Sequence, residues 1–144
     1  MIKFVSTAEV LEIRNIVLRE GKLTNEECVF DGDLEGTTFH VGYEREGKLV
    51  CVATFHKQPH EKFEGTGYQL RGMATLPEYQ GKGLGNLLMN FAIVYLRGQK
   101  ANYLWCNARE VAYKFYLSLG FEFISAEFQI PSIGPHRQMY LKIN

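Results

Sequence analysis

The sequence has 144 residues, in which 16 lysines and arginines balance 16 aspartates and glutamates. Its 46% hydrophobic and 22% charged residues are typical of a globular protein and exclude a disordered or fibrous one. The length predicts a single domain over residues 1–144, with no room for a second domain of ordinary size. Because the chain carries no excess of basic residues, we expect no nucleic acid as its main partner.

The cysteines and the hydropathy pattern indicate a cellular location. Cys28, Cys51 and Cys106 are too scattered for a disulfide framework, and no pair has the spacing of a zinc or redox motif. No stretch approaches the ~18 apolar residues of a membrane span, and the first residues lack the apolar segment of a signal peptide. We therefore expect reduced thiols, a cytoplasmic location and no membrane partner.

Runs of β-branched and aromatic residues between turn signals predict the strands. We expect strands over residues 2–6, 37–45, 48–57, 68–76, 103–106, 121–130 and 137–143. Glu46 and Gly47 separate the second strand from the third and predict a hairpin with a tight turn. Together with the helices described next, the order predicts an α/β domain with a mixed sheet covered by helices.

Helix signals occur at three places. Ser6 and Glu9 have the spacing of a capping box, which begins a helix that ends near Gly21. From Leu84 onward, apolar residues recur with helical spacing and predict a helix buried along one face. Asn107 is expected to cap a further helix, which Gly120 ends. The acidic residues 24–36 predict a loop with at most a short helix.

The most specific feature is the turn Gln80-Gly81-Lys82-Gly83-Leu84-Gly85-Asn86, which precedes the second helix. Glycines let backbone N–H groups approach a ligand, and a helix N-terminus favours an anion such as a pyrophosphate. A Walker A loop is excluded because Lys82 is followed by Gly83 instead of Ser or Thr. A dinucleotide-binding fingerprint fails as well. Starting from Gly81 it needs a glycine where Asn86 stands, and starting from Gly83 it needs Gly or Ala where Leu88 stands.

Two segments resemble the GNAT family of acetyl-CoA-dependent acyltransferases. Residues 70–85, LRGMATLPEYQGKGLG, are similar to the strand, turn and helix segment of the family, with Gln80 where Arg is commoner. Residues 107–121, NAREVAYKFYLSLGF, resemble its second signature. The resemblance implies the acyl-CoA N-acyltransferase fold, in which a mostly antiparallel central sheet is splayed at the cofactor site and helices cover both faces.

Shorter pieces resemble a narrower, ElaA-like bacterial branch of the family. They are Leu11-x-Ile13-Arg14-x-x-Val17, Asp31-Gly32-Asp33 followed by His40, and Phe128 with Ile133-Gly134-Pro135-His136 and Met139. With these pieces the resemblance extends over nearly the whole chain.

The resemblance also implies a site for acetyl-CoA as co-substrate, with an amine as acceptor. The cofactor-binding residues would be Met73, Ala74, Thr75, Gln80, Gly81, Lys82, Gly83, Leu84, Gly85, Asn86, Asn107 and Tyr116. Backbone groups of Met73, Ala74 and Thr75 would serve the pantetheine arm and the thioester carbonyl, and Gly72 is compatible with a bulge there. The alternative is an ordinary, fully paired central strand.

Tyr116 and Asn107 each have two interpretations. By resemblance Tyr116 is the general acid, since a phenol can donate its proton to a departing thiolate, whereas its position on an apolar helix face also suits a packed aromatic residue. Asn107 would hold the pantetheine arm, although capping alone explains an asparagine there.

Several residues are candidates for the general base. His136 ranks first because the last hairpin would lie near the acceptor side, and Glu78, Asp33, Glu127 or a water chain are alternatives.

Cys106 could instead carry the acetyl group covalently, but a buried free cysteine is commoner. His56 and His60 would suit a metal only on a helix, which Pro59 disfavours, so we expect no metal.

These observations predict an N-acetyltransferase that transfers an acetyl group directly to a primary amine in a ternary complex. The alternative is a catalytically silent acyl-CoA-binding module that senses or scaffolds. The acidic stretch 24–36 would attract a cationic acceptor such as a polyamine. Exposed edge strands are compatible with a homodimer.

Overall fold

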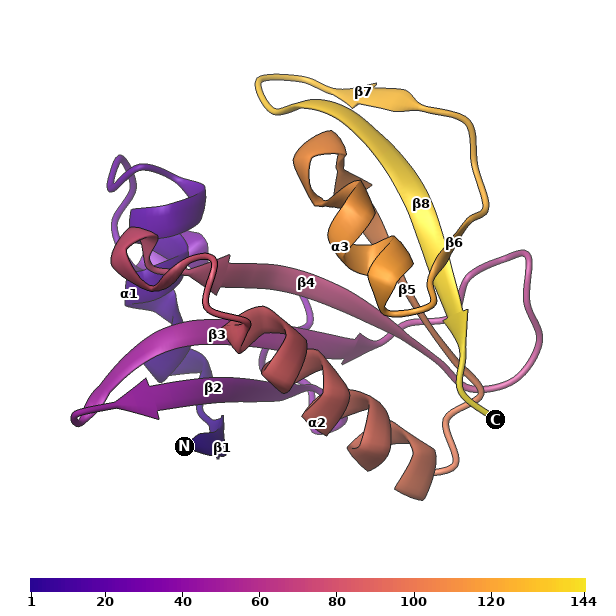
Figure 1. Ribbon diagram of the computed structural model, residues 1–144, viewed down its shortest axis with the longest axis horizontal. Coiled ribbons are helices and arrows are strands. Elements are labelled where there is room, and N and C mark those ends of the chain that lie inside the picture. The colour runs from indigo at the N-terminus through magenta and orange to yellow at the C-terminus, as the bar shows by residue number, and fades with distance from the viewer. The chain divides into compact units, whose positions relative to one another are not determined.

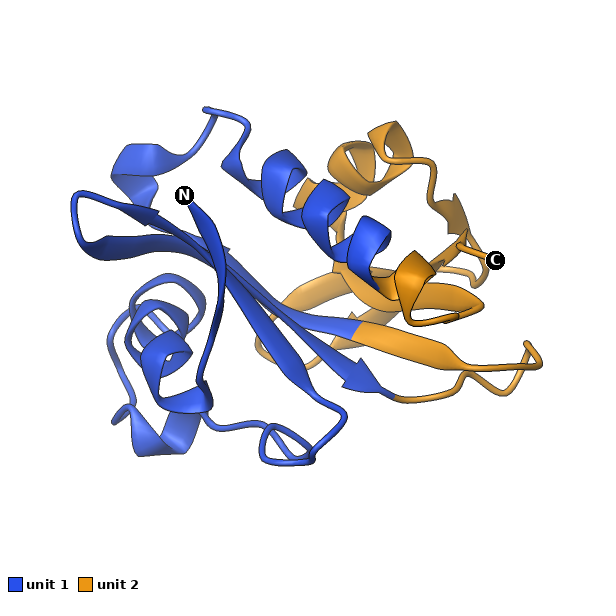
Figure 2. Cartoon of the chain, turned by 90° about the horizontal axis from the view of Figure 1, so that it is seen from below, with its two compact units in different colours: residues 1–57, 70–95 blue, residues 58–69, 96–144 orange.

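The computed structural model describes all 144 residues (Figure 1). The residues group into two compact units (Figure 2). Unit 1 contains Met1–Lys57 and Leu70–Tyr95, and unit 2 contains Gln58–Gln69 and Leu96–Asn144. The prediction of one domain over residues 1–144 stays a prediction.

The sheet of unit 1 begins with three antiparallel strands, β1 (Ile2–Val5), β2 (Phe39–Arg45) and β3 (Lys48–Lys57). The predicted hairpin is confirmed, because Arg45 faces Lys48 across the turn. Glu46 and Gly47 both have positive φ there, 53° and 77°, which is the backbone of a two-residue hairpin turn whose twist matches the strands. Residues 70–75 of strand β4 (Gly67–Thr75) also belong to this unit.

Two α-helices begin in unit 1 and lie on opposite faces of its strands (Figure 2). Helix α1 (Thr7–Leu18) starts with the predicted capping box, in which the Ser6 hydroxyl accepts from the Glu9 N–H and the Glu9 carboxylate accepts from the Ser6 N–H. Helix α2 is Leu84–Gly98. The predicted acidic loop contains one short 3-10 turn, η1 (Glu26–Cys28).

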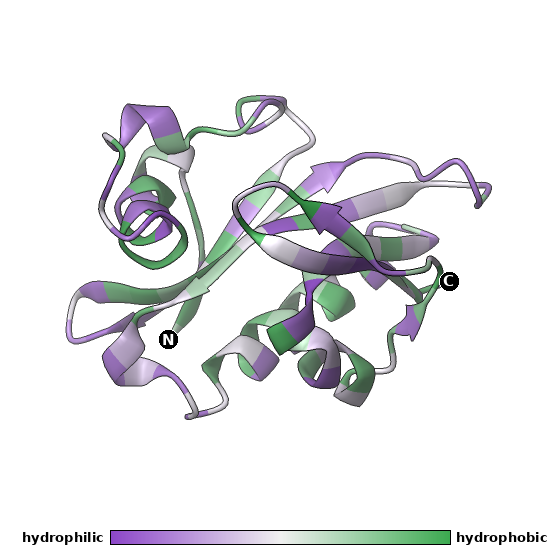
Figure 3. Ribbon diagram, turned by 90° about the horizontal axis from the view of Figure 1, so that it is seen from above, coloured by the Kyte–Doolittle hydropathy of each residue, from purple (hydrophilic) through white to green (hydrophobic).

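The core of unit 1 is formed by apolar residues that the strands and helices turn inward. Val10, Val41, Val50, Val52, Phe55 and Leu88 are fully buried. Figure 3 shows hydrophobic residues along the strands of this unit. Burial of such side chains stabilises the unit by roughly 1.5–3 kcal/mol for each of the larger ones.

Unit 2 is built around strand β8 (Gly134–Lys142). Three strands pair with it antiparallel, namely β5 (Tyr103–Arg109), β6 (Glu122–Phe123) and β7 (Phe128–Ile130). The first residues of β4 pair in parallel with β5, since Gly67 faces Tyr103 and Gln69 faces Trp105. The 3-10 turn η3 (Glu110–Ala112) leads into helix α3 (Tyr113–Ser118).

Two expectations about this unit are wrong in their boundaries. Asn107 does not cap a helix, because β5 continues through it to Arg109 and Asn107 faces Gln138 of β8. The single strand expected over residues 121–130 is divided into β6 and β7, and between them the Ser125 hydroxyl accepts the N–H of Gln138 at 2.8 Å. A side chain therefore replaces a backbone partner of β8 at that point.

The observed elements confirm the predicted class, a mixed α/β fold with an open mixed sheet and three α-helices. Strand β4 pairs with β5 in parallel, whereas β1 with β2, β2 with β3, and β5, β6 and β7 with β8 pair antiparallel. The predicted opening of the sheet beside Met73, Ala74 and Thr75 stays a prediction. None of the helices has the length and hydropathy needed to span a bilayer.

Candidate functional site

The glycine-rich turn lies between the 3-10 turn η2 (Pro77–Tyr79) and helix α2. Gly81 and Gly83 have φ of 76° and 78°, a region that favours glycine, and a Cβ on either would meet no atom within 4 Å. The glycines are therefore required by the backbone path and leave open space above it. The first helical bond of α2 joins the Leu87 N–H to the Gly83 carbonyl at 3.1 Å.

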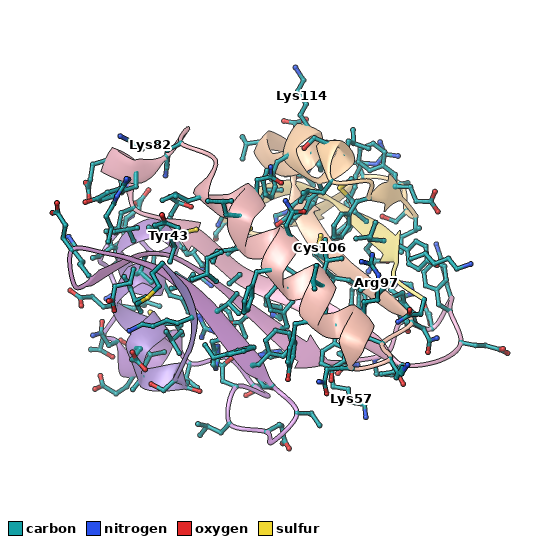
Figure 4. All side chains as sticks on the ribbon, turned by 60° about the horizontal axis from the view of Figure 1, so that its bottom comes forward. Tyr43, Lys57, Lys82, Arg97, Cys106 and Lys114 are labelled. Atoms are coloured by element: carbon teal, nitrogen blue, oxygen red, sulfur yellow. The ribbon has the colours of Figure 1, made fainter.

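This turn can hold an anion. The helical N–H groups that precede Leu87 have no partner within α2, as at every helix N-terminus, and the first turn contains no acidic residue. Gly81, Lys82 and Gly83 are exposed, and Lys82 adds a positive charge at this end of the helix (Figure 4). The helix dipole and the free donors favour a phosphate at this position.

The Gln80 side chain braces the end of β4. Its Nε2 donates to the Thr75 carbonyl at 3.0 Å, and the Thr75 hydroxyl lies 3.1 Å from Cys51 Sγ. Gly72 has φ of 62° inside the strand, which is the left-handed conformation found at the first residue of one type of β-bulge. Met73 and Thr75 are half-buried and Ala74 is buried. The positive φ of Gly72 thus makes β4 irregular just before these three residues, which the sequence allowed but did not predict.

In unit 2, helix α3 carries the buried Tyr116, whose ring lies against Phe115 and Phe121 at centroid distances of 5.1 and 5.3 Å. Burial, with a smaller contribution from Cys106, raises the pKa of Tyr116 well above its ordinary value. The phenol is therefore protonated at neutral pH, and the raised pKa also makes it a weaker proton donor than an ordinary tyrosine. Burial also raises the pKa of the Cys106 thiol, so this residue is a poor nucleophile.

His136 lies in β8, two residues from the glycine at which the strand begins. Its Nδ1 lies 2.8 Å from the Gly134 carbonyl. A carbonyl can only accept, so Nδ1 carries a proton and the lone pair of the neutral ring is on Nε2. The ring is 4% exposed and lies 6.0 Å from that of Phe128. Asn107 is exposed on β5 in the same unit.

The comparisons with known proteins decide the family. The sequence model of the Acetyltransferase (GNAT) family matches residues 8–121. A relative from Bacillus subtilis (strain 168), described as the uncharacterized N-acetyltransferase YitI, is 34% identical over 140 residues, which cover 96% of this chain and 93% of that protein. The chain belongs to the GNAT acetyltransferase family. It is accordingly an acyltransferase, as the two sequence segments predicted.

Solved structures of GNAT proteins share the fold. An aminoglycoside 6'-N-acetyltransferase complexed with coenzyme A superposes with a TM-score of 0.80 at 13% identity and covers 100% of this chain and 97% of that one. Escherichia coli ElaA gives a TM-score of 0.78 at 15% identity, with 97% of both chains covered. At these identities the matches show the fold alone. They agree with the resemblance to the family and to ElaA.

The GNAT fold places the predicted residues in two groups. Unit 1 brings together the end of β4, Gln80 and the turn up to Asn86, while unit 2 contains Asn107, Tyr116 and His136. Among the other base candidates, Glu78 and Glu127 are exposed, and Glu127 accepts from the Tyr113 hydroxyl at 3.3 Å. No group of three or more His, Cys, Asp or Glu side chains is gathered to hold a metal ion.

One guanidinium of this GNAT chain has no ion-pair partner and was not predicted from the sequence. Arg71 on β4 is half-buried, with its Cζ 4.4 Å from the centre of the Phe30 ring. The ion pairs of the chain use the cations of Lys3, Arg14 and Lys22, and His56 also contacts Asp33. Burial lowers the pKa of Arg71, and Arg14 and Arg19 lower it further against the opposing effect of Asp33 and Asp31. Only the adjacency of Arg71 to Gly72 in the family segment could have indicated it.

Proposed function

We propose that this protein transfers the acetyl group of acetyl-CoA to a primary amine by direct attack in a ternary complex. The observation that carries the proposal is the turn before α2, where two left-handed glycines expose N–H groups at a helix N-terminus that has no acidic residue. The residues present therefore fit a diphosphate. Gln80, Gly81, Lys82, Gly83, Leu84, Gly85 and Asn86 are assigned to that group, and Asn107 is assigned to the pantetheine arm.

In the reaction a C–N bond forms between the amine and the thioester carbonyl carbon, and the C–S bond breaks. Backbone groups of Met73, Ala74 and Thr75 are assigned to stabilise the carbonyl oxygen as it gains negative charge. His136 Nε2, which carries the lone pair of the neutral ring, accepts the proton that the amine loses. Tyr116 gives its proton to the departing thiolate, so the products are an amide and a free thiol. Exchange with water then restores both side chains.

The acceptor, we infer, carries an anionic group beside its amine. Arg71 is always charged and half-buried, and it has no ion-pair partner, although Asp33 and Asp31 as well as two further arginines contribute to the field around it. A carboxylate or phosphate there would gain a bidentate, partly desolvated partner. This differs from the cationic acceptor that the acidic stretch suggests, and one member of that stretch, Asp33, already pairs with Arg14 at 2.6 Å.

The test of catalysis is the substitution Tyr116→Phe. Loss of the acid should lower kcat by about 100-fold while the affinity for acetyl-CoA, measured by titration calorimetry, is kept. Tyr113→Phe is the matched control on the same helix, since Tyr113 is bonded to Glu127 and has no assigned role. Thiol release against an amine panel gives the rate. Tight binding of acetyl-CoA without turnover on any amine would favour the silent acyl-CoA-binding module instead.

The acceptor class is tested with pairs of amines that differ only in charge, such as amino acids and their amides. Wild-type protein should prefer the acids, and Arg71→Gln should lower kcat/KM for them about tenfold or more while changing the amides little. Equal rates on both members of each pair would refute the anionic acceptor and leave the acetyl-transfer proposal in place.

A further inference from the structure

A buried polar cluster in unit 1 has no role in the steps above. It consists of Thr7, Arg14, Asp33, His40, Thr54 and His56. Arg14, Asp33 and Thr54 are at most 3% exposed, and the two histidines are at most 6% exposed. Its members come from α1, the loop before β2, and strands β2 and β3. Such a group is costly to bury unless every member is satisfied.

Asp33 is the centre of the cluster, and its carboxylate is saturated. Oδ2 accepts from Arg14 Nη1 at 2.6 Å and from the Phe30 N–H at 2.7 Å. Oδ1 accepts from Arg14 Nη2 at 3.1 Å and from His56 Nε2 at 2.9 Å. Burial alone would raise the pKa of Asp33, but the hydrogen bonds from His56 and Arg14 outweigh it and hold the pKa below its ordinary value. Asp33 is unsuited to act as the general base, because both of its carboxylate oxygens already accept hydrogen bonds from neighbouring groups.

The remaining contacts form a hydrogen-bond chain with one direction. The Arg14 Nη2 group donates to Thr54 Oγ1 at 2.8 Å, and Thr54 lies 2.7 Å from His40 Nδ1. His40 Nε2 lies 3.0 Å from Thr7 Oγ1, which donates to the Asp33 carbonyl at 3.2 Å. A guanidinium only donates and a carbonyl only accepts. Because Thr7 donates to that carbonyl, it accepts from His40 Nε2–H, and a neutral His40 then offers Nδ1 as the acceptor for the buried Thr54 O–H.

The cluster fixes the segment that carries Phe30. Arg14 Nη1 donates to the Cys28 carbonyl at 2.9 Å, and the Asp33 carboxylate accepts from the Phe30 N–H, so the segment is held at Cys28 and at Phe30 itself. The Arg14 Cζ lies 3.9 Å from the centre of the Phe30 ring, and Arg71 lies over the same ring. A Cβ on Gly72 would come within 2.8 Å of that ring. The Phe30 ring therefore packs directly against β4 at Gly72.

We propose that Asp33 is a positioning residue for the acceptor: it holds Phe30 and Arg14 so that the Phe30 ring supports the Arg71 guanidinium in its binding orientation. This inference rests on the proposed role of Arg71. The cation–π contact orients the guanidinium without neutralising it, which leaves its charge for the acceptor. Asp33 acts through Arg71 and does not touch the reacting atoms.

The experiment is a double-mutant cycle between Asp33→Asn and Arg71→Gln, with an amino acid and its amide as acceptors. Asp33→Asn alone should raise KM for the acid about tenfold. KM for acetyl-CoA and the kinetics with the amide should stay near the wild-type values. In the Arg71→Gln background the same substitution should have no further effect on the acid. Independent, multiplying effects, or an equal loss on the amide, would overturn the positioning role.

The two proposals fail in different ways. If Arg71→Gln alone leaves the preference for the acid unchanged, the acceptor class is wrong and the positioning role falls with it. If Arg71→Gln removes the preference but Asp33→Asn does not weaken it, only the positioning role is wrong.

A second pair of variants is available if Asp33→Asn does not fold. His56→Leu removes a donor to Asp33, whereas His56→Gln keeps an amide donor at a similar position. His56→Leu should raise KM for the acid severalfold and His56→Gln should restore it. Equal kinetics of the two variants would contradict the inference.

Discussion

The glycine-rich turn and the buried cluster lie in the same unit and work by opposite means. The turn is exposed, and its function is assigned to backbone N–H groups that no side chain obstructs. The cluster is buried, and most of its contacts join one side chain to another. The turn is encoded within seven consecutive residues, 80–86, whereas the cluster joins Thr7 to His56 across four elements.

The contrast predicts how each region responds to substitutions. A backbone site tolerates changes of side chain until one alters φ or blocks the approach of a ligand. The buried side-chain network, in which only Arg14 Nε lacks a hydrogen-bond partner, tolerates few changes, because each partner that is removed leaves another polar group buried and unpaired. We therefore expect changes in the turn to weaken ligand binding and to cost less stability than changes in the cluster, which affect stability first.

The largest effect is expected from Asp33→Ala. It leaves the Arg14 guanidinium buried at 1% exposure without its counterion, and breaking a buried pair in this way costs about 3–5 kcal/mol in the free energy of unfolding. Chemical denaturation measures the loss. Asp31→Ala is the matched control, because Asp31 is exposed two residues away and should change stability by less than about 0.5 kcal/mol. A small loss in the free energy of unfolding in both variants would mean that the cluster contributes little to stability.

Gly83→Val tests the turn and should separate binding from folding. The left-handed φ of 78° is unfavourable for a β-branched residue, and the side chain would fill open space where the diphosphate is assigned. We expect the affinity for acetyl-CoA to fall at least about tenfold, with a stability cost of about 1–3 kcal/mol. Gly98→Ala, at the other end of α2, has neither a positive φ nor a neighbour within 4 Å and should bind normally. Normal affinity in Gly83→Val would place the diphosphate elsewhere.

The difference between the two regions also explains what could be predicted from the sequence. The capping box at Ser6 and the hairpin turn at Glu46 depend on neighbouring residues, and both were predicted correctly. Helix α2 was predicted from its apolar spacing. The assignment to the GNAT family likewise rests on two continuous segments.

Features that depend on tertiary partners could not be predicted in the same way. Asn107 has the residue type of a helix cap, but pairing with β8 keeps it in a strand. His40 was noted only as part of a resemblance, and Asp33 also as a candidate base in the acidic stretch. Nothing local indicates that Arg14 and Thr54 meet them. The residues next to Arg71 in the sequence also do not indicate that it lacks an ion-pair partner. That depends on which acidic side chains the fold brings close to it.

The smallest effect is the pH dependence of the cluster, which arises from His40. Burial, the largest cause, lowers the pKa of His40 below its ordinary value of 6.5. The same direction follows from the hydrogen-bond chain, since a protonated His40 would leave the Thr54 hydroxyl, which is 0% exposed, without an acceptor. The unfolded chain therefore takes up a proton on this residue at a higher pH than the folded protein does.

The contribution of His40 to stability is fully present above pH 6.5 and is lost as the pH falls from 6.5 through the lower, folded-state pKa. Urea denaturation between pH 8 and pH 5 should show the parent losing more stability on acidification than His40→Gln, in which nothing titrates at this position. Parallel curves for the two proteins would show that His40 is not held neutral. In that case the directed chain from Arg14 to Asp33 would be wrong, even though the saturated carboxylate of Asp33 would still set the cluster apart from the turn.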